Sequence, residues 1–501
     1  MPSYSSKQFL EEYELELEKE FEYNGITASW APNPNDGSDG GPRFWDDEDE
    51  IIPAVARIPR KGFSRGTITQ ALSSDEAFLA VATDTCIRIY RVESLSMTDE
   101  LTVGHDEAHY VRGSVFTAKK SYSIDKEKSQ EYVLISYSSS FGGGPGTIHI
   151  WNLDAQGCLR HDLRAPDFPA DNVAKNALKA IENDLSQYGI STEQVNKIQD
   201  GFLDILAAAH TTHAISKIKT IQDAQFTGFN SSILSHACDQ FLYEDHGQTT
   251  QHGMRPEAEL PQIVIMNLKS FHEICRLKGH TDVIMWSGWS LDDEVVATAS
   301  WDATFRIWNA RTGVCKHIIG PTGGQNWAGQ FLPDGKHLLL SGGRPHPLAL
   351  YDIETGQKIR SFDPTDTKLD HWLRYFTVHP QQHEDLVIVQ NGMTLLAWQP
   401  LHPENQIQEL FALKPGDNTM RNGFARTVDF GWSDRAQDIF IAKNTDGSAF
   451  VWDKARALKW RFQRQKARSV SGQGSAWLVR RKDADWIASL DGDGAVRFWK
   501  L

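Results

Sequence analysis

Short segments in which apolar and polar residues alternate recur along most of the chain, and Gly, Asp or Asn residues bound many of them. Alternation with a period of two is typical of a β-strand with one buried face, so the chain is predicted to contain many short antiparallel strands. Eight of these segments have a similar shape, as in IHIWNL, FRIWNA and VRFWKL. Their closing residues are Tyr90, Trp151, Met266, Trp308, Tyr351, Trp398, Trp452 and Trp499.

The eight closing residues lie 61, 115, 42, 43, 47, 54 and 47 residues apart. Most of these intervals match the forty-odd residues of a four-stranded propeller blade. One four-stranded sheet cannot bury both of its faces alone, but sheets stacked around an axis bury the faces of one another. The spacing therefore predicts an all-β propeller with eight blades, with seven blades as the alternative.

Residues 275–310, CRLKGHTDVIMWSGWSLDDEVVATASWDATFRIWNA, closely resemble one unit of the WD-repeat family. In that family a histidine after a glycine, a strand hydroxyl, a turn aspartate and the closing tryptophan form a buried hydrogen-bonded tetrad. The matching residues here are His280, Thr298, Asp302 and Trp308. The resemblance implies a WD-repeat β-propeller over residues 51–501, in which these four residues have a structural role.

Residues 1–50 depart from the repeat. Apolar residues four apart, among many glutamates, predict an acidic amphipathic helix over residues 5–22, followed by a linker rich in Gly, Asn, Pro and Asp. Because amphipathic stripes usually bury locally, this helix is expected to dock on the flank of the propeller. The last repeat ends at Leu501 without an outer strand, which residues near Pro53–Pro59 are expected to supply by closing the ring.

Residues 170–220 are the second departure. Two runs of helical spacing, separated at Gly189, predict a helical hairpin inserted into the propeller. An insertion of this kind either caps a propeller or recruits partners.

Charge and cysteine content narrow the function classes. The chain has 51 basic and 66 acidic side chains, a net charge of −15, which disfavours binding to nucleic acid or to anionic membrane surfaces. Its five cysteines are scattered without metal-binding spacing, so reduced thiols are expected. No stretch of about 20 apolar residues occurs, and the expectation is an intracellular protein, cytoplasmic or nuclear.

Motifs of catalysis are missing from the sequence. It contains no GxSxG elbow, phosphate-binding loop, HExxH motif or dinucleotide fingerprint, so neither an enzyme nor a cofactor is predicted. Histidines gather in three places without the repeated spacing of metal ligands. These pairs are His210/His213, His246/His252 and His371/His379. No metal site is predicted, and His246 with His252 is the pair to test for one.

WD-repeat proteins commonly bind partners on the face that carries the starts of the innermost strands and the residue before the turn aspartate. Aligned on that pattern, this chain places aromatic residues and arginines at the rim of several blades, and an aromatic-x-Arg pattern recurs three times. The rim residues are Tyr110, Arg112, Met285, Trp301, Trp327, Arg344, Trp372, Arg374, Phe424 and Arg426. Such residues dominate interface hot spots and suit an acidic or aromatic peptide.

The rim has two other interpretations. Each arginine could pair with a carboxylate of its own blade, while the aromatic residues fill the wedge between sheets. Alternatively, the protein's own acidic segment, Asp46–Glu50, could lie on this face and compete with partners.

The sequence thus predicts a non-catalytic protein–protein interaction scaffold that presents the propeller rim to a partner peptide or domain. Two functions from other classes compete with this prediction. One is a propeller enzyme or small-ligand binder that uses the central channel, and the other is a G-protein β-like subunit whose N-terminal helix pairs with a partner.

Overall fold

The computed structural model describes residues 15–501 with internal gaps, and the described residues form 36 β-strands and no helix. No helix long and apolar enough to cross a membrane is therefore found in this part of the chain. The gaps comprise residues 36, 46, 54–68, 83–85, 103–108, 121–129, 141–145, 160–219, 228–230, 246–259, 269–271, 344–346, 364–372, 383, 393, 416–426, 434–437, 445–447, 464–474, 483 and 491–494.

The first half of the chain forms three of the larger sheets. The first contains β7 (Thr69–Leu72), β8 (Phe78–Ala82), β9 (Cys86–Arg91) and β10 (Met97–Thr102). The second is a seven-stranded sheet of β11 (His109–Lys120), β12 (Gln130–Ser140), β13 (Gly146–Leu153), β14 (Thr220–Gln225), β15 (Gln240–Asp245), β16 (Gln262–Asn267) and β17 (Glu273–Leu277). The third contains β18 (Ile284–Trp289), β19 (Val295–Ser300), β20 (Phe305–Asn309) and β21 (Cys315–Ile319).

The second half forms four more sheets, three of which include N-terminal strands. One contains β22 (Asn326–Phe331), β23 (His337–Gly342), β24 (Leu348–Asp352) and β25 (Lys358–Ser361). The next contains β26 (Phe376–Val378), β27 (Val387–Asn391), β28 (Thr394–Trp398), β29 (Gln408–Pro415) and β1 (Leu15–Glu20). Another joins β30 (Thr427–Trp432), β31 (Ile439–Asn444), β32 (Ala449–Asp453) and β33 (Leu458–Gln463) to β4 (Ser29–Trp30) and β5 (Arg43–Phe44). The last contains β34 (Ala476–Arg481), β35 (Ala484–Leu490), β36 (Val496–Lys500) and β6 (Glu50–Ile52).

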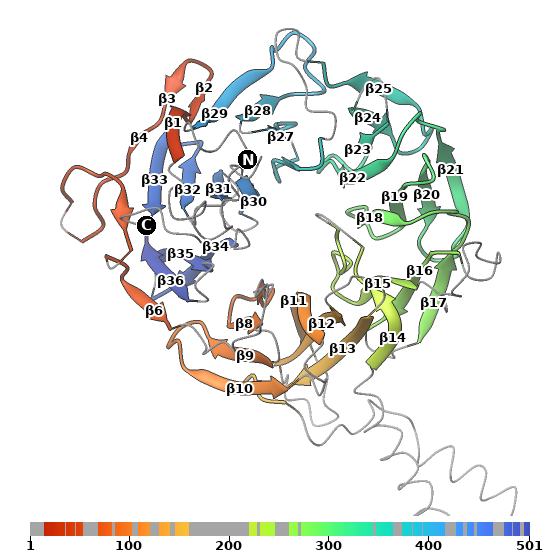
Figure 1. Ribbon diagram of the computed structural model, residues 1–501, viewed down its shortest axis with the longest axis horizontal. Helices are drawn as coiled ribbons and strands as arrows, with labels where there is room; N and C mark the ends of the chain where they lie inside the picture. Colours follow the sequence, from red (N-terminus) through yellow and green to blue (C-terminus); the bar gives the residue numbers. More distant parts are fainter. Residues whose placement is uncertain are drawn as a thin grey trace, which may run out of the picture.

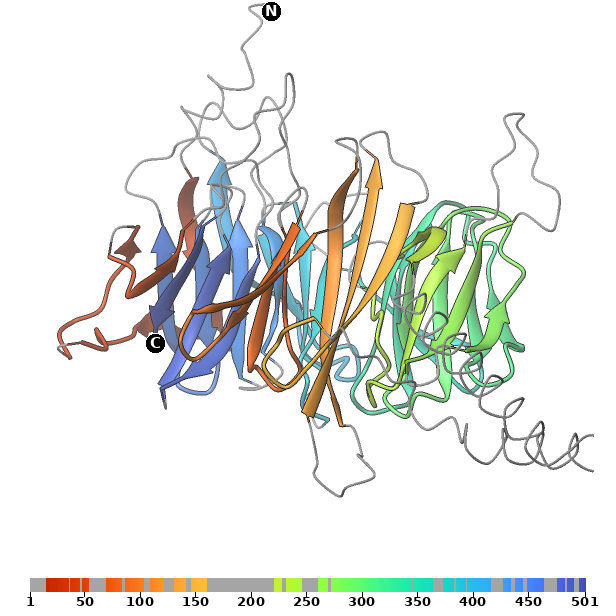
Figure 2. The same ribbon diagram turned by 90° about the horizontal axis from the view of Figure 1, so that it is seen from below.

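The sheets follow one another around a ring in chain order (Figure 1). Within most sheets consecutive strands pair antiparallel, from an inner strand near the axis of the ring to an outer strand at its perimeter. Seen from the side, the strands run across the thickness of the ring (Figure 2). The predicted all-β architecture of antiparallel sheets is therefore confirmed.

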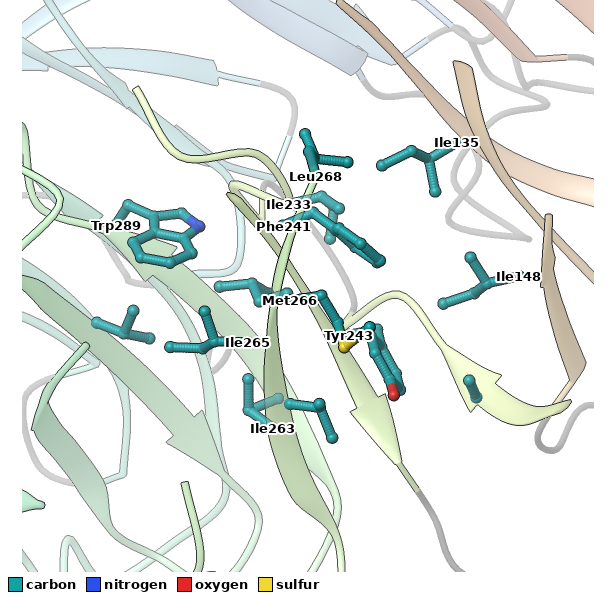
Figure 3. Packing of buried hydrophobic residues seen from close by; sticks show 14 of the residues in the cluster. Ile135, Ile148, Ile233, Phe241, Tyr243, Ile263, Ile265, Met266, Leu268 and Trp289 are labelled. Carbon is teal, nitrogen blue, oxygen red and sulfur yellow. The ribbon is translucent and has the colours of Figure 1, made fainter. Parts of the chain in front are cut away.

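Neighbouring sheets bury their faces against each other. In β12, Ile135 packs in a cluster shared with β15 and β16, whereas the next residue back, Leu134, packs in a cluster shared with β8 and β9. Figure 3 shows the first cluster. Phe241 of β15 and Ile265 of β16 lie between Ile135 of β12 and Trp289 of β18. Successive side chains of a strand point to opposite faces, so one strand supplies the cores on both of its sides.

The prediction of a helix over residues 5–22 is wrong for the part of that range that the structure describes. Leu15–Glu20 form β1, which pairs antiparallel with β29 from Leu15 opposite Pro415 to Glu20 opposite Phe411. The sequence LELEKE alternates with a period of two as well as fitting a helical stripe, and the edge of β29 satisfies its backbone hydrogen bonds. Residues 1–14, and residues 170–219 of the predicted helical hairpin, lie outside the described residues. Thr220, at the end of that prediction, begins β14.

Residues after β1 continue along the perimeter of the ring. β2 (Glu22–Tyr23) and β3 (Ile26–Thr27) form a small hairpin, after which β4 and β5 pair parallel with β33. β6 then pairs antiparallel with β36, with Ile52 opposite Val496 and Glu50 opposite Phe498. The prediction that N-terminal residues complete the last sheet is confirmed, but the strand is Glu50–Ile52 and lies just before the predicted Pro53–Pro59.

The acidic segment after the linker is bound at the outer edge of that last sheet. Asp49 lies 3.0 Å from Arg43, and Glu50 lies 2.7 Å from Arg481 and 3.0 Å from Lys482. The hypothesis that this segment lies on the rim at the starts of the inner strands is therefore wrong for residues 47–50. Its charges instead pair with basic side chains next to β6 and β36.

Phe21 anchors this N-terminal arm, residues 15–52, between two sheets. Its ring is fully buried and packs 5.3 Å from Phe411 of β29 and 5.7 Å from Trp452 of β32, measured between ring centroids. We expect Phe21→Ala to lower the free energy of unfolding by about 3–5 kcal/mol, because truncation of a buried phenylalanine removes apolar burial and leaves a cavity. Urea denaturation at 25 °C measures this loss.

The control for that measurement is Ile26→Ala in the same arm, whose side chain is 61% exposed. It should change the unfolding free energy by less than about 0.5 kcal/mol. Equal effects of the two variants would show that the arm is not anchored through Phe21.

Candidate partner-binding site

In the sheet of β18–β21, four side chains from the strands, a turn and the loop before β18 form a continuous hydrogen-bonded network. His280 lies in the loop before β18, Thr298 in β19, Asp302 in the turn after β19, and Trp308 in β20. Trp308 Nε1 donates to Thr298 Oγ1 at 2.9 Å. His280 Nε2 lies 2.7 Å from the same hydroxyl, and His280 Nδ1 lies 2.7 Å from Asp302 Oδ2.

The donors and acceptors of this chain fit a neutral histidine. Thr298 accepts from the indole and can donate its own proton to Nε2, so Nδ1 carries the proton donated to Asp302. Burial lowers the pKa of His280, against the opposing effect of Asp302. Burial alone would raise the pKa of Asp302, but hydrogen bonds from His280 and Thr304 hold that pKa well below its usual range. Asp302 is therefore an ionised acceptor facing a neutral imidazole.

The same network fixes the turn that carries Trp301. Asp302 accepts the backbone N–H groups of Thr281 at 3.1 Å and of Thr304 at 2.8 Å. The backbone N–H of Trp301 donates to the carbonyl oxygen of Val283 at 3.0 Å. Because these bonds tie the turn to the loop before β18, the position of the Trp301 side chain at the rim follows from the buried network.

Four of the predicted rim residues meet in one cluster, although they come from three neighbouring sheets. The guanidinium carbon of Arg374 lies 3.7 Å from the centroid of the Trp327 ring. Trp301 meets Trp327 edge to face, with centroids 5.3 Å apart and planes at 68°. Met285 and Trp301 both pack against the buried cluster that contains Trp327. We name these four residues, Met285, Trp301, Trp327 and Arg374, the rim cluster.

Burial within the rim cluster is uneven. Trp327 is only 7% exposed, whereas Met285, Trp301 and Arg374 are half-buried. One tryptophan thus fills the wedge between sheets, and the other three side chains present a surface above it. A guanidinium over an indole gains cation–π attraction, which holds Arg374 against the Trp327 ring.

The remaining rim residues are only partly within the described chain. Tyr110 lies in β11 opposite Ser139, and Arg112 lies at an irregularity in the register of the same strand. Arg344, Trp372, Phe424 and Arg426 lie outside the described residues, as do His246 and His252.

One group of side chains in the described residues has the composition of a metal site. Ligand atoms of His379, Glu384 and Asp438 all lie within 4.8 Å of one another. Lys454 Nζ lies among them, 2.7 Å from Glu384 and 3.2 Å from Asp438. His379 Nδ1 accepts the backbone N–H of Gln381 at 3.3 Å, which leaves the proton of a neutral ring on Nε2 and facing the carboxylates.

The ammonium of Lys454 therefore occupies the place that a metal ion would take. Its ion pairs with Glu384 and Asp438 join two neighbouring sheets. The sequence singled out His379 but gave no sign of its partners. Glu384 follows it by five residues, while Asp438 and Lys454 are brought to it only by packing of the next sheet.

Comparisons with known proteins match parts of the chain. No protein-family model matches it. Over 78 residues, 15% of the chain, it is 37% identical to THO complex subunit 3 of Arabidopsis thaliana, across 24% of that protein. It is 29% identical over 101 residues to apoptotic protease-activating factor 1 of Homo sapiens, across 19% of this chain and 8% of that protein. It is 25% identical over 151 residues to small ribosomal subunit protein RACK1 of Caenorhabditis elegans, across 30% of this chain and 43% of that protein.

The chain thus spans less than half of the length of each of these curated relatives. Among solved structures, it is similar to a chain in the crystal structure of a mitotic checkpoint complex. That similarity covers 91% of this chain and 94% of the other, with 13% sequence identity and a TM-score of 0.42.

Removal of one hydroxyl should test the buried network. We expect Thr298→Val to lower the free energy of unfolding by about 2–4 kcal/mol, because it leaves the indole of Trp308 without an acceptor and His280 without a donor. Urea denaturation measures the loss. The control is Thr281→Val, an exposed position whose backbone N–H bond to Asp302 is unaffected. A loss no larger than that of the control would contradict the proton arrangement given above.

The buried neutral histidine also predicts a pH dependence. Since the pKa of His280 is lower in the folded chain than in the unfolded chain, the unfolded chain binds more protons below pH 6.5 and stability falls as the pH falls. We expect the wild type to lose up to about 2 kcal/mol more than His280→Gln between pH 7 and pH 5. Parallel losses in the two proteins, measured by urea denaturation, would show that His280 does not titrate on unfolding.

Proposed function

Because the chain is a WD-repeat β-propeller protein, we propose that it is a non-catalytic protein-interaction scaffold whose rim cluster binds a partner peptide. The observation that carries the proposal is the stack of Arg374 on Trp327 beside Trp301, formed by three sheets at the starts of their inner strands. Half-buried tryptophan and arginine on a rigid support are the residues that supply most binding energy in protein interfaces.

Arg374 suggests the chemistry of the partner. A guanidinium stacked on an indole directs its in-plane N–H groups sideways, a geometry suited to a carboxylate. Trp301 and Met285 add apolar contact area next to it. An acidic or aromatic peptide fits this combination, and Tyr110, Arg112, Arg344, Trp372, Phe424 and Arg426 would extend the same surface around the rim.

The proposal includes eight blades. β14 pairs with β13 from Thr220 to Ala224 and with β15 through Ala224 and Gln225. Counted as the outer strand of one unit and the inner strand of the next, β14 divides the seven-stranded sheet into two units of four strands. With the six other large sheets this division makes eight.

Two features support a non-catalytic, intracellular role. Two of the histidine–carboxylate groups in the described residues, those of His280 and His379, are engaged by Thr298 and by Lys454, as a structural network and an ion pair would be. None of the five cysteines, all of which lie in the part of the chain that the structure describes, is in a disulfide, which suits a reducing compartment.

The proposal is tested by affinity capture from native lysate with the wild type and with the double variant Trp301→Ala, Arg374→Ala. Partners retained by the wild type should be lost from the double variant, because it removes the exposed part of the rim cluster and leaves Trp327 in place. The control is Arg311→Ala, an arginine that is 77% exposed and pairs with Glu294 away from the rim.

Both variants should show a cooperative urea transition and be fully folded at the temperature of the capture before the comparison is made. If the double variant keeps every partner, the rim cluster is not the binding surface and the scaffold proposal loses its site.

A further inference from the structure

A glycine-rich segment, residues 320–325, leads into β22 and ends two residues before Trp327 of the rim cluster. We name this segment the rim loop. Gly323 and Gln325 in it are exposed. The backbone N–H of Thr322 donates to the carbonyl oxygen of Ala303 at 2.9 Å, so the rim loop is held beside the turn after β19 that carries Trp301.

Glycines fix the shape of the rim loop. Gly323 has a φ of +70°, in the left-handed region that glycine adopts without strain. The facing Gly343 donates its backbone N–H to the carbonyl oxygen of Gln325 at 3.1 Å. A Cβ atom at Gly343 would lie only 2.4 Å from the carbonyl oxygen of Thr322, so the two backbones pack directly against each other. The rim loop is therefore held in one conformation from both sides.

Three successive backbone N–H groups of the rim loop have no acceptor. Within the part of the chain that the structure describes, the N–H groups of Gly323, Gly324 and Gln325 donate no hydrogen bond. Successive N–H groups in a turn that contains a left-handed residue form a concavity that binds anions. The rim loop thus offers three fixed donors to a ligand at the surface.

A buried side chain points to a ligand independently of the loop backbone. Asn326 is fully buried, and its Nδ2 has no hydrogen-bond partner among the described residues. Its Oδ1 accepts from Thr322 Oγ1 at 2.7 Å, which holds the amide against the rim loop. Because a buried donor without an acceptor is costly, an acceptor atom of a ligand at the rim loop would satisfy this amide.

The charges around the rim loop favour a negative ligand. Arg374 stacks on Trp327, the residue after Asn326, and brings a positive charge to the same rim. Asp302, the carboxylate of the neighbouring turn, is buried and bonded to His280. Donors therefore predominate over acceptors where the rim loop meets the rim cluster.

We propose that the rim loop binds the phosphate group of a phosphorylated partner peptide, while the rim cluster contacts the neighbouring residues of that peptide. A phosphate on a side chain carries a charge of about −2 and three acceptor oxygens. It can accept from the three backbone N–H groups and the Asn326 amide together, whereas a carboxylate has two oxygens and one charge. The phosphate defines the peptide of the proposed function, on which this assignment rests.

Ligand-observed NMR with the full chain, at fixed ionic strength, tests the assignment. The probe is acetyl-phosphoSer-Gly-Phe-amide, compared with acetyl-Ser-Gly-Phe-amide and acetyl-Glu-Gly-Phe-amide. We expect the phosphopeptide to bind at least about tenfold more tightly than either, because charge-assisted hydrogen bonds to the phosphate are lost in both. Equal affinity for the glutamate peptide would overturn the choice of phosphate.

Inorganic phosphate separates a peptide ligand from a free anion. It should bind at least about threefold more weakly than the phosphopeptide, because it makes no contact with the rim cluster. Inorganic phosphate that binds as tightly as the phosphopeptide would overturn the assignment to a peptide.

Two variants locate the phosphate. Gln325→Glu adds a negative charge at an exposed position of the rim loop, and Asn326→Asp replaces the free N–H group but keeps an oxygen for Thr322. Each should weaken binding of the phosphopeptide at least about fivefold. The control is Gln357→Glu, the same change at an exposed turn before β25, which should bind like the wild type. Wild-type affinity in the two loop variants would refute the rim loop as the site.

Each variant should show a cooperative urea transition before its affinity is compared, and the exposed Gln325→Glu keeps the test decisive if Asn326→Asp does not fold. The loop variants leave the four residues of the rim cluster unchanged. If the double variant Trp301→Ala, Arg374→Ala loses its partners while the chain binds the phosphorylated and unphosphorylated peptides equally, the scaffold role stands and the phosphate assignment alone is refuted.

Discussion

A small sheet with two apolar faces is stable only where a neighbouring sheet covers each face, and a row of such sheets leaves two faces open unless it closes into a ring. In this protein the closure is made by the backbone pairing of Glu50–Ile52 with Val496–Phe498. Ile52, Val496 and Phe498 lie in one buried cluster with Leu79 and Val81 of the first sheet. The first and last sheets are thus joined by a core to which both ends of the chain contribute.

The N-terminal arm extends this closure over three successive sheets. β1, β4 with β5, and β6 occupy the outer edges of the sheets that end in β29, β33 and β36. Side chains of the arm secure each step, with Phe21 between two sheets, Lys459 against Glu20 at 2.8 Å, and Arg497 over the Trp45 ring at 3.7 Å. Edge strands that would otherwise expose unpaired backbone groups are covered by the chain itself.

A closed ring holds the inner strands in fixed positions, and the proposed rim cluster depends on that rigidity. The rim cluster takes one residue from each of several strand starts and turns, and it can form only if three sheets keep their relative places. Surfaces assembled in this way present several side chains at once without the entropy cost of ordering a loop.

Much of the fold could be predicted from local pattern. Alternating residues mark the strands, and the segment 275–310 contains His280, Thr298, Asp302 and Trp308, whose contact is implied by the resemblance of this segment to a WD-repeat unit. The rim residues Trp301, Trp327 and Arg374 could each be predicted from their place in a repeat, but their stacking could not, because it joins three repeats.

Residues 15–20 show the limit of local pattern most clearly. LELEKE satisfies both a helical stripe and a strand alternation, and only the free edge of β29 decides between them. The group of His379, Asp438 and Lys454 has no local signature for the same reason. The sequence by itself determined which segments are strands and which residues are buried within a repeat, since those depend on neighbours a few residues away. The tertiary structure decided which distant side chains meet, because packing between sheets depends on how the whole ring closes.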